Sequence, residues 1–519
     1  MVFKQSFSLV KGNGLRGASN FTKSEVCDDS LNYKSETVPF SLYYYMSSTI
    51  ITGRKEPSHM KNSSEDVIKS YRAMPVLAFE HQHLTSFSGL VLFWQLFKNL
   101  MLLPRIESCF KHLVTAPIFT YGRIILLLII HVLAGYRRIS DIRYYQHDPL
   151  IKRVLGLNML PDISTISRVL ASADGRCVDN LRALCRELVM QRLRSCTLFR
   201  ITLDFDGSVI STKRHAEQTA VGYNKKHKGQ RSYYPLFCTI AQTGQIFDLL
   251  HRPGNVHDSR YAAEFITACI ETIRTALPGI IIEVRMDAAF FSHAIVSMLH
   301  NQQIQFSISV PFERLVELKQ MVESRYRWTC CNQDIAFFEQ AWKPKSWDRT
   351  YRFIFVRTRD IIQSKDPIQL DLFIPMEYGY SHKVIITNKT TAATQVIAFH
   401  NGRGSQENVF AELKTDANME YVPFNRLIPN QIYLFSAVLA HNLSREFQMA
   451  TKEQQRNTTF SRVQLWAFQQ ISTIRRIIVN RAGRLTEPGR VLTLTVSGDN
   501  EIENLFTNTI DELQLQKAA

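Results

Sequence analysis

Three acidic residues stand where metal-dependent chemistry on phosphate esters could be built. Asp206 ends the alternating segment 199–206, and Asp287 ends the apolar segment 280–287. Glu407 follows in a segment with helical spacing. Convergent carboxylates are the oxygen ligands that Mg²⁺ and Mn²⁺ take, and two such ions can hold the attacking and leaving oxygens of a phosphodiester in line. We therefore take these three residues as candidate catalytic and metal-binding residues.

Asp204 competes with Asp206 for the same role. In a strand both side chains point to the same side, because successive side chains alternate. Gly207 and Ser208 follow Asp206 at the end of the predicted strand, so we favour Asp206. The sequence leaves either residue open as the metal ligand.

The segment around Glu407 carries charges at helical offsets. The spacing of three, four and seven residues joins His400, Arg403, Glu407 and Lys414. On one helix these offsets place side chains on one face, and two glycines predict that the helix begins near Ser405. Charges on a buried face are expensive unless they are paired or metal-bound, and neither cation has an obvious acidic partner on that face. The alternative is a solvated helix with incidental ion pairs.

The predicted strands and helices around these acids indicate an α/β domain. Strands are predicted at 199–206, 233–240, 245–251, 280–287 and 304–310, and helices at 258–277 and 292–301. Three strands in an antiparallel meander, then parallel strands joined by helices, is the order of the ribonuclease-H-like fold. In α/β sheets ligands bind at the carboxyl ends of the strands, which is where Asp206 and Asp287 are expected.

The rest of the chain predicts an α-helical N-terminal domain before this catalytic core and a β-rich insertion within it. The expected parts are a disordered extension at 1–62, a helical DNA-binding domain at 63–197, the first part of the core at 198–311, the β-rich insertion at 312–398, the last part of the core at 399–448, and a C-terminal helical segment with a loose tail at 449–519.

Charge points to a polyanionic partner. The formal net charge is +16, an excess typical of nucleic-acid binding. Lys225, Lys226 and Arg231 form a basic loop with nearby tyrosines, which suits a DNA backbone. Arg168 lies in the first turns of a helix capped by Asp162 or Ser164, and such a helix start can donate to phosphates. The alternatives are a solvated hairpin loop and an ordinary capped helix.

Cysteine usage and hydropathy exclude several classes of protein. The nine cysteines are scattered and contain no CxxC pair, which argues for a reducing compartment and against a disulfide framework or a zinc site. The apolar run at 124–130 is too short to span a bilayer and predicts a buried helix. We expect a soluble intracellular protein.

With these motifs in place, the chain resembles bacterial insertion-sequence transposases of the DDE class, in the branch with a Tyr-Arg-Glu-Lys signature. At the spacing of that signature the chain has His400, Arg403, Glu407 and Lys414, so three of four residues match and His replaces Tyr. The family's first motif, Asp-x-Thr, is met by Asp206-Gly207-Ser208, and its second motif by Asp287. The resemblance covers residues 75–450.

The resemblance implies a cut-and-paste transposase that binds transposon-end DNA, cleaves it and joins the 3′-hydroxyl ends to target DNA. It implies Mg²⁺, or Mn²⁺ in its place, held by Asp206, Asp287 and Glu407. It also implies phosphate contacts by Arg403 and Lys414, and by His400 in place of the tyrosine.

The implied partners are double-stranded DNA, as transposon ends and target, and a second copy of the chain in the end complex. A cytoplasmic, nucleoid-associated protein without a membrane segment is expected. Two alternatives stay open: a catalytically inactive, transposase-derived DNA-binding protein, and a two-metal nuclease on the same fold.

Overall fold

The computed structural model describes residues 74–518, apart from positions 76, 115, 223, 225–226, 258–259, 360–378 and 458. The predicted disordered extension at 1–62 lies outside the described residues, and so do Lys225 and Lys226 of the predicted basic loop.

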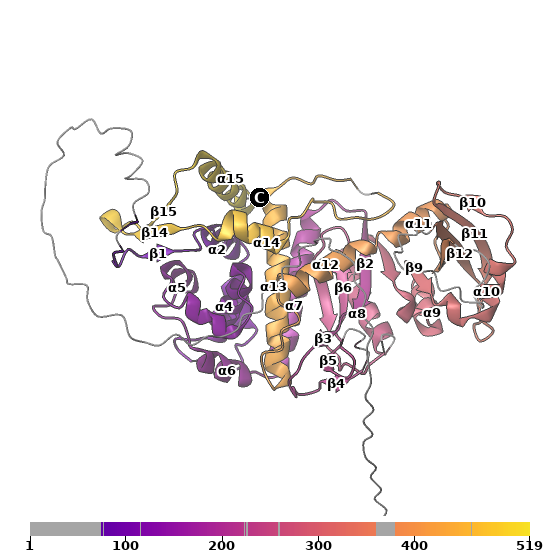
Figure 1. Ribbon diagram of the computed structural model, residues 1–519, viewed down its shortest axis with the longest axis horizontal. Helices are drawn as coiled ribbons and strands as arrows, with labels where there is room; N and C mark the ends of the chain where they lie inside the picture. The colour runs from indigo at the N-terminus through magenta and orange to yellow at the C-terminus, as the bar shows by residue number, and fades with distance from the viewer. Residues whose placement is uncertain are drawn as a thin grey trace, which may run out of the picture. The chain divides into compact units, whose positions relative to one another are not determined.

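A nine-stranded mixed sheet contains Asp206 in one strand and has another strand that ends directly before Asp287, whereas Glu407 lies on a helix. Its strand order is β10-β11-β12-β13-β9-β8-β2-β6-β7 (Figure 1). The strands predicted for the core are β2 (Arg200–Gly207), β6 (Leu236–Ile240), β7 (Ile246–Leu250), β8 (Ile281–Met286) and β9 (Gln305–Val310). β2 pairs antiparallel with β6 and parallel with β8, and β8 pairs parallel with β9. The predicted order, a meander followed by parallel strands, is therefore present.

One predicted strand is split in two. The sequence predicts a single strand at 233–240, but β5 (Arg231–Tyr233) belongs to a small sheet with β3 (Ile210–Ser211) and β4 (Ala220–Val221). Pro235 separates β5 from β6, because proline has no N–H to donate to a ladder.

The two faces of the central strands differ in polarity. Ile201, Leu203 and Phe205 of β2 point into an apolar core shared with α8 (Ala262–Ala276) and α9 (His293–Asn301). Because side chains alternate along a strand, the residues between them point to the opposite face. That opposite face carries the polar residues of the candidate site.

The predicted β-rich insertion is part of the same sheet. Its strands are β10 (Thr329–Cys330), β11 (Ile335–Trp342), β12 (Tyr351–Arg359) and β13 (Tyr380–Thr387), with α10 (Val316–Glu323) before them. β13 pairs antiparallel with β9, with Val384 opposite Val310. The inserted strands therefore lengthen the central sheet, and the chain returns through α11 (Ala393–Asn401) and α12 (Gly404–Thr415).

The described N-terminal part consists mainly of helices. Its elements are α2 (Leu90–Asn99), α3 (Leu102–Ser108), α4 (Tyr121–Ala134), η1 (Ile139–Tyr144), α5 (Pro149–Leu155), α6 (Ile163–Ala171) and α7 (Gly175–Ser195). Every residue of α4 except Arg123 is buried, so the apolar run is a core helix. No described helix is both long and apolar enough to cross a membrane.

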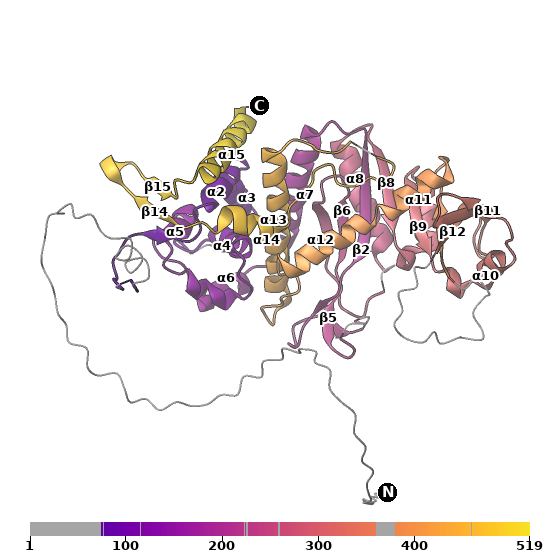
Figure 2. The same ribbon diagram turned by 45° about the horizontal axis from the view of Figure 1, so that its top comes forward.

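The C-terminal segment is ordered and packs on the N-terminal helices, which corrects the prediction of a loose tail. After α13 (Leu427–Thr451) it forms α14 (Ile471–Ile474), the π-helical η4 (Arg475–Val479), β14 (Gly483–Thr486), β15 (Thr493–Val496) and α15 (Asn500–Ala518). β14 pairs with β1 (Leu84–Thr85), and α15 contacts α2 and α13 (Figure 2). One hydrophobic core therefore takes residues from both ends of the described chain.

Close backbone packing at Gly89 shows how tightly these ends fit. Gly89 precedes α2, and a Cβ there would lie 2.0 Å from the carbonyl oxygen of Ile478 in η4. Such an approach is open only to glycine. The sequence could not reveal this contact because the two residues are far apart along the chain.

We expect Leu513→Ala to lower the free energy of unfolding by about 2–5 kcal/mol, the range for a buried leucine in a core. Leu513 is fully buried on α15, whereas Leu515 on the same helix is 66% exposed. The matched control Leu515→Ala should change stability by less than about 0.5 kcal/mol. Urea unfolding measures both, and equal effects of the two substitutions would contradict the docking of α15.

Candidate active site

The register of the parallel strands arranges polar side chains in rows on one face of the sheet. Two rows are paired directly between β2 and β8: Thr202 with Glu283, and Asp204 with Arg285. The third, Asp206 with Asp287, follows the last pair of that ladder. Adjacent strands lie about 4.8 Å apart, so the two aspartates are neighbours at the carboxyl ends of their strands.

The first row is a buried charge cluster around Glu283. Its carboxylate accepts from Lys389 Nζ at 2.6 Å, Arg462 Nε at 2.8 Å and Arg200 Nη1 at 3.2 Å. Burial alone would raise the pKa of Glu283, but the hydrogen bonds and charges of Arg462 and Lys389 outweigh it and lower the pKa to about 2. Glu283 is thus an ionised structural group that holds the segment around Arg462 on the sheet.

The second row is the ion pair between Asp204 and Arg285. Arg285 donates to the two carboxylate oxygens of Asp204 at 2.6 and 2.7 Å, and both side chains are buried. The remaining nitrogen of Arg285 donates to the carbonyls of Phe399 at 2.9 Å and Ser461 at 2.7 Å. Burial raises the pKa of Asp204, and the charge of Arg285 opposes that shift. Asp204 is fully engaged in this pair, which leaves Asp206 as the candidate ligand.

The third row opens at the edge of the sheet. Asp206 and Asp287 are both partly exposed. The N–H of Gly207 donates to Asp206 Oδ1 at 2.8 Å. Asp287 caps the short helix η2 (Ala288–Phe290) by accepting from the N–H of Ala289 at 3.0 Å. Both carboxylates thus stand at the strand ends where α/β sheets bind ligands.

Arg403 links Asp206 to Glu407. Its Nη1 lies 3.0 Å from Asp206 Oδ2, and its Nη2 lies 3.8 Å from Glu407 Oε1. Glu407 is in the first turn of α12, and its side chain is 70% exposed. Because one guanidinium reaches both carboxylates, α12 carries Glu407 to the end of β2. In this structure the guanidinium of Arg403 compensates the charge of both carboxylates.

The three carboxylates do not form a closed ligand set in this structure. Among the described residues, one trio of His, Cys, Asp or Glu has all its ligand atoms within 4.8 Å, and it consists of His112, Asp174 and Cys177. The convergence of Asp206, Asp287 and Glu407 at metal-site distances therefore stays a prediction.

Gln406 fixes α12 above the second row. Its Nε2 donates to the carbonyl of Asp204 at 3.0 Å and to Thr239 Oγ1 at 3.1 Å, and the side chain is buried. These bonds to β2 and β6 set the position of the next residue, Glu407. Sequence reasoning missed Gln406, because an uncharged residue next to a candidate acid gives no signal of its own.

His400 is buried, which corrects its predicted role as a DNA contact. It belongs to α11 rather than to the Glu407 helix, and it is 1% exposed. Its Nδ1 and Nε2 are hydrogen-bonded to Ser307 Oγ at 3.0 Å and Ser309 Oγ at 2.8 Å. Burial, followed by the nearby cations, lowers the pKa of His400 well below its usual value. The neutral imidazole holds α11 against β9 and has no surface to offer a phosphate.

The two cations of the predicted helical face do have acidic partners, contrary to expectation. Arg403 pairs with Asp206 and Glu407, as described above. Lys414 pairs with Glu420 at 3.2 Å. The partner of Arg403, Asp206, comes from β2, which is distant in the sequence. The partner of Lys414, Glu420, lies in the turn that follows the end of α12.

The remaining predicted DNA contacts differ in their surroundings. Arg168 is exposed on α6, where it donates to Thr165 Oγ1 at 3.1 Å, and Asp162 caps that helix as predicted. Arg231 is partly buried and donates to Thr219 Oγ1 at 2.9 Å, so its guanidinium holds the small sheet together. Arg168 keeps a surface for phosphate, whereas Arg231 is tied into the fold.

Lys383 is a further cation at the site that sequence reasoning missed. Its Nζ donates to Asn401 Oδ1 at 3.4 Å. Although part of the side chain is exposed, desolvation and then the charge of Arg403 lower the pKa of Lys383 to about 8, while Glu407 opposes the shift. Lys383 lies on β13, and its approach to α12 depends on the extension of the sheet.

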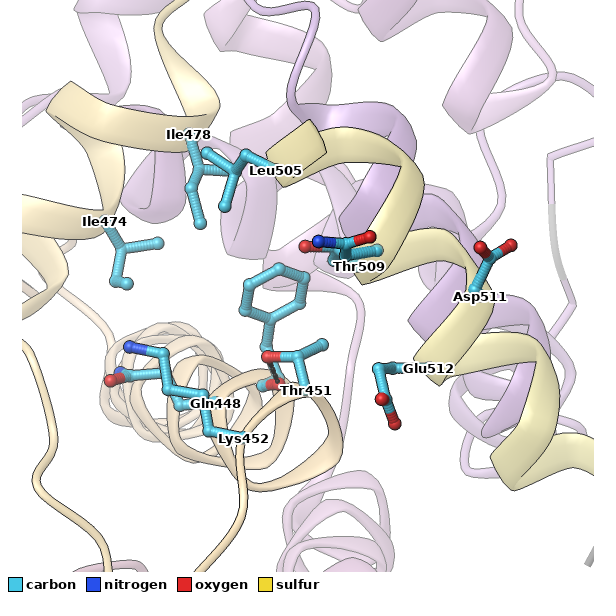
Figure 3. A pocket seen from close by; sticks show the side chains of 11 residues that line it. Gln448, Thr451, Lys452, Ile474, Ile478, Leu505, Thr509, Asp511 and Glu512 are labelled. Atoms are coloured by element: carbon cyan, nitrogen blue, oxygen red, sulfur yellow. Dashed lines mark hydrogen bonds between the residues drawn. The ribbon is translucent and has the colours of Figure 1, made fainter. Parts of the chain in front are cut away.

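A pocket elsewhere in the molecule does not belong to this site. It encloses about 480 Å³ between α13, the α14–η4 segment and α15 (Figure 3). Ile478 and Leu505 line one part of it, and Asp511 and Glu512 another. None of its lining residues belongs to the three polar rows.

A family model described as transposase DDE domain group 1 matches residues 69–518. A search of curated proteins found no significant match. The piggyBac transposase synaptic complex with hairpin DNA is similar at 10% identity and a TM-score of 0.39, over 76% of this chain and 79% of that chain. The Mos1 transposase paired-end complex is similar at 9% identity and a TM-score of 0.17, over 33% of this chain and 57% of that chain.

We expect Asp204→Asn to destabilise the protein by about 3–5 kcal/mol, because it leaves the buried charge of Arg285 unpaired. Asp206→Asn is the matched substitution two residues on, where the ion pair is partly exposed, and it should cost less than about 1 kcal/mol. Urea unfolding of both variants measures the contrast. If Asp206→Asn were the more damaging of the two, the structural role assigned to Asp204 would be wrong.

We expect Arg403→Ala to bind Mn²⁺ more tightly than the unaltered protein when no DNA is present. The guanidinium competes with a metal ion for Asp206 and Glu407. A partly exposed ion pair contributes up to about 1 kcal/mol, which corresponds to roughly a fivefold gain in affinity. Calorimetric titration with Mn²⁺ tests this, with Lys414→Ala as the control. Unchanged or weaker binding by Arg403→Ala would show that the two cations do not compete.

Proposed function

The chain belongs to the transposase DDE domain group 1 family, and from this premise we propose that it cleaves transposon-end DNA and joins the 3′-hydroxyl ends to target DNA. The observation that carries the proposal is the pair Asp206 and Asp287 at adjacent carboxyl ends of parallel strands. Glu407 reaches the same edge through Arg403. Metal-dependent phosphodiester transfer requires convergent carboxylates, and the placement of these three residues supports the proposal.

Asp206, Asp287 and Glu407 would hold the divalent cation, Mg²⁺ or Mn²⁺ in its place. When bound, such ions hold the attacking and leaving oxygens of the phosphodiester in line. The chain's own part is position: β2 and β8 fix the two aspartates, and Gln406 fixes the turn of α12 that carries Glu407.

Cations around the acids would bind the phosphates of double-stranded DNA. Arg403 offers a planar fork for a phosphate, and Lys383 and Lys414 offer point charges. Arg168 presents a further exposed cation on α6. Lys225 and Lys226 keep their proposed role in the basic loop. The net charge of +16 supports a polyanionic partner.

The wider proposal follows the resemblance noted in the sequence. It places the chain in the bacterial insertion-sequence branch with the Tyr-Arg-Glu-Lys signature, acting as a homodimer in the end complex. It also places the protein at the nucleoid, in the cytoplasm, where its DNA substrates lie. Gel-filtration mass of the protein with and without transposon-end DNA tests the dimer.

We expect Asp287→Asn to lower strand cleavage by on the order of a thousandfold, since a bound metal contributes several kcal/mol to transition-state stabilisation. The amide keeps the shape and hydrogen-bond acceptor of the cap but loses the charge. DNA binding should be nearly unchanged, because it depends on Lys and Arg contacts to phosphate. The substrate is the DNA that flanks the gene for this chain, incubated with Mg²⁺.

Glu264→Gln, on α8 and outside the polar rows, is the control for loss of a carboxylate. Cleavage by Asp287→Asn at the unaltered rate would overturn the site. Tight, specific binding without cleavage by the unaltered chain would support the inactive DNA-binding alternative. Cleavage without end joining would support the nuclease.

A further inference from the structure

Three side chains with metal-binding chemistry meet in the N-terminal helical part, away from the proposed active site. His112 Nε2 lies 3.1 and 3.2 Å from the two carboxylate oxygens of Asp174. Cys177 Sγ lies 3.7 Å from the same nitrogen. All three ligand atoms are within 4.8 Å of one another. The proposed transposase chemistry uses none of these residues.

Two segments of the fold, the start of α7 and the turn after α3, hold these three residues in place. Asp174 and Cys177 lie at the start of α7, where Asp174 is the N-cap and accepts from the backbone N–H of Cys177 at 3.0 Å. His112 lies in the turn that follows α3. Asn180 of α7 donates to the carbonyl of Cys109 at 2.9 Å and holds that turn to the helix. The site therefore joins segments more than sixty residues apart.

The distances match a tetrahedral metal site. Zinc bonds of about 2.0–2.3 Å to nitrogen, oxygen and sulfur imply ligand-to-ligand edges of roughly 3.3–3.7 Å. The separations from His112 to Asp174, 3.1 and 3.2 Å, and from His112 to Cys177, 3.7 Å, lie at or near this range. The remaining separation, from Asp174 to Cys177, is within 4.8 Å.

Helix capping alone does not account for the arrangement. The cap requires the carboxylate of Asp174 and the backbone of Cys177, but not the imidazole of His112 or the thiol. The side chain of His112 is 17% exposed, and that of Asp174 is 50% exposed. Cys177 is fully buried behind them.

We propose that His112, Asp174 and Cys177 bind a zinc ion that fastens the turn after α3 to the start of α7. Imidazole, carboxylate and thiolate are each zinc ligands, and the nitrogen and sulfur donors distinguish this site from the all-oxygen sites that Mg²⁺ prefers. The thiol binds as a thiolate, so binding releases its proton. The fourth position faces solvent and takes water. This site is independent of the proposed transposase function.

Cobalt and zinc serve as the probes, in the full chain carrying Cys330→Ser and Cys331→Ser. Those two cysteines are exposed, and their removal prevents metal binding by adjacent surface thiols. We expect one equivalent of Co²⁺ to give a thiolate-to-cobalt charge-transfer absorption, and Zn²⁺ to displace it. Zn²⁺ should also raise the midpoint of thermal unfolding, because the ion binds the native state.

Asp174→Asn is the sharpest variant, because asparagine caps a helix as well as aspartate does. It should preserve the fold of the metal-free protein but weaken Co²⁺ binding by at least about tenfold. Loss of a residue that merely hydrogen-bonds to a metal ligand already weakens metal binding by roughly tenfold or more, so loss of a ligand should weaken it at least as much. Cys177→Ser should remove the charge-transfer absorption, while Cys196→Ser should leave it unchanged. Circular dichroism checks that each variant is folded.

Two outcomes would overturn the proposal. One is the absence of any charge-transfer absorption in the folded parent protein at millimolar Co²⁺. The other is an absorption that persists unchanged in Cys177→Ser, which would place the metal at another thiol. Neither outcome bears on cleavage, so failure here is distinguishable from failure of the transposase proposal.

Discussion

The buried pair between Arg285 and Asp204 is the interaction on which the centre of the molecule depends. The guanidinium of Arg285 on β8 donates to Asp204 on β2 and so joins the two strands. It also donates to the carbonyls of Phe399 in α11 and Ser461 in the segment after α13, and so holds both against the sheet. A buried charge is tolerable only when it is paired and its remaining donors are satisfied. The pair therefore dictates that these four parts of the chain meet over the same face of the sheet.

The three polar rows differ in how far their charges are paired and buried. The row of Glu283 is closed by three cations, and the row of Asp204 by Arg285. The row of Asp206 and Asp287 comes last, at the edge, and solvent reaches it. The charges of the two inner rows are thus paired within the fold, and the outer row is the one that our proposal assigns to metal binding.

The two ends of the described chain cooperate in a second core. α4 and α13 lie together in it, and the C-terminal β14 and α15 cover the N-terminal β1 and α2. The helical part that precedes the sheet is therefore completed by residues that follow it. Because this hydrophobic core combines segments from both ends of the described chain, domain boundaries drawn along the sequence do not coincide with the boundaries of the core.

The sequence by itself determined most of the elements, the order of the central strands and the two aspartates at strand ends. It could do so because alternation and helical spacing are local properties of the chain. Only the tertiary structure shows that Asp204 is buried against Arg285 while Asp206 is partly exposed, since both point to the same side and differ in depth. It likewise decided that His400 is buried and that His112 and Cys177 meet, despite the lack of a CxxC pair. The burial of a residue and its contacts with distant residues depend on the segments that pack against it, and local sequence periodicity does not specify those segments.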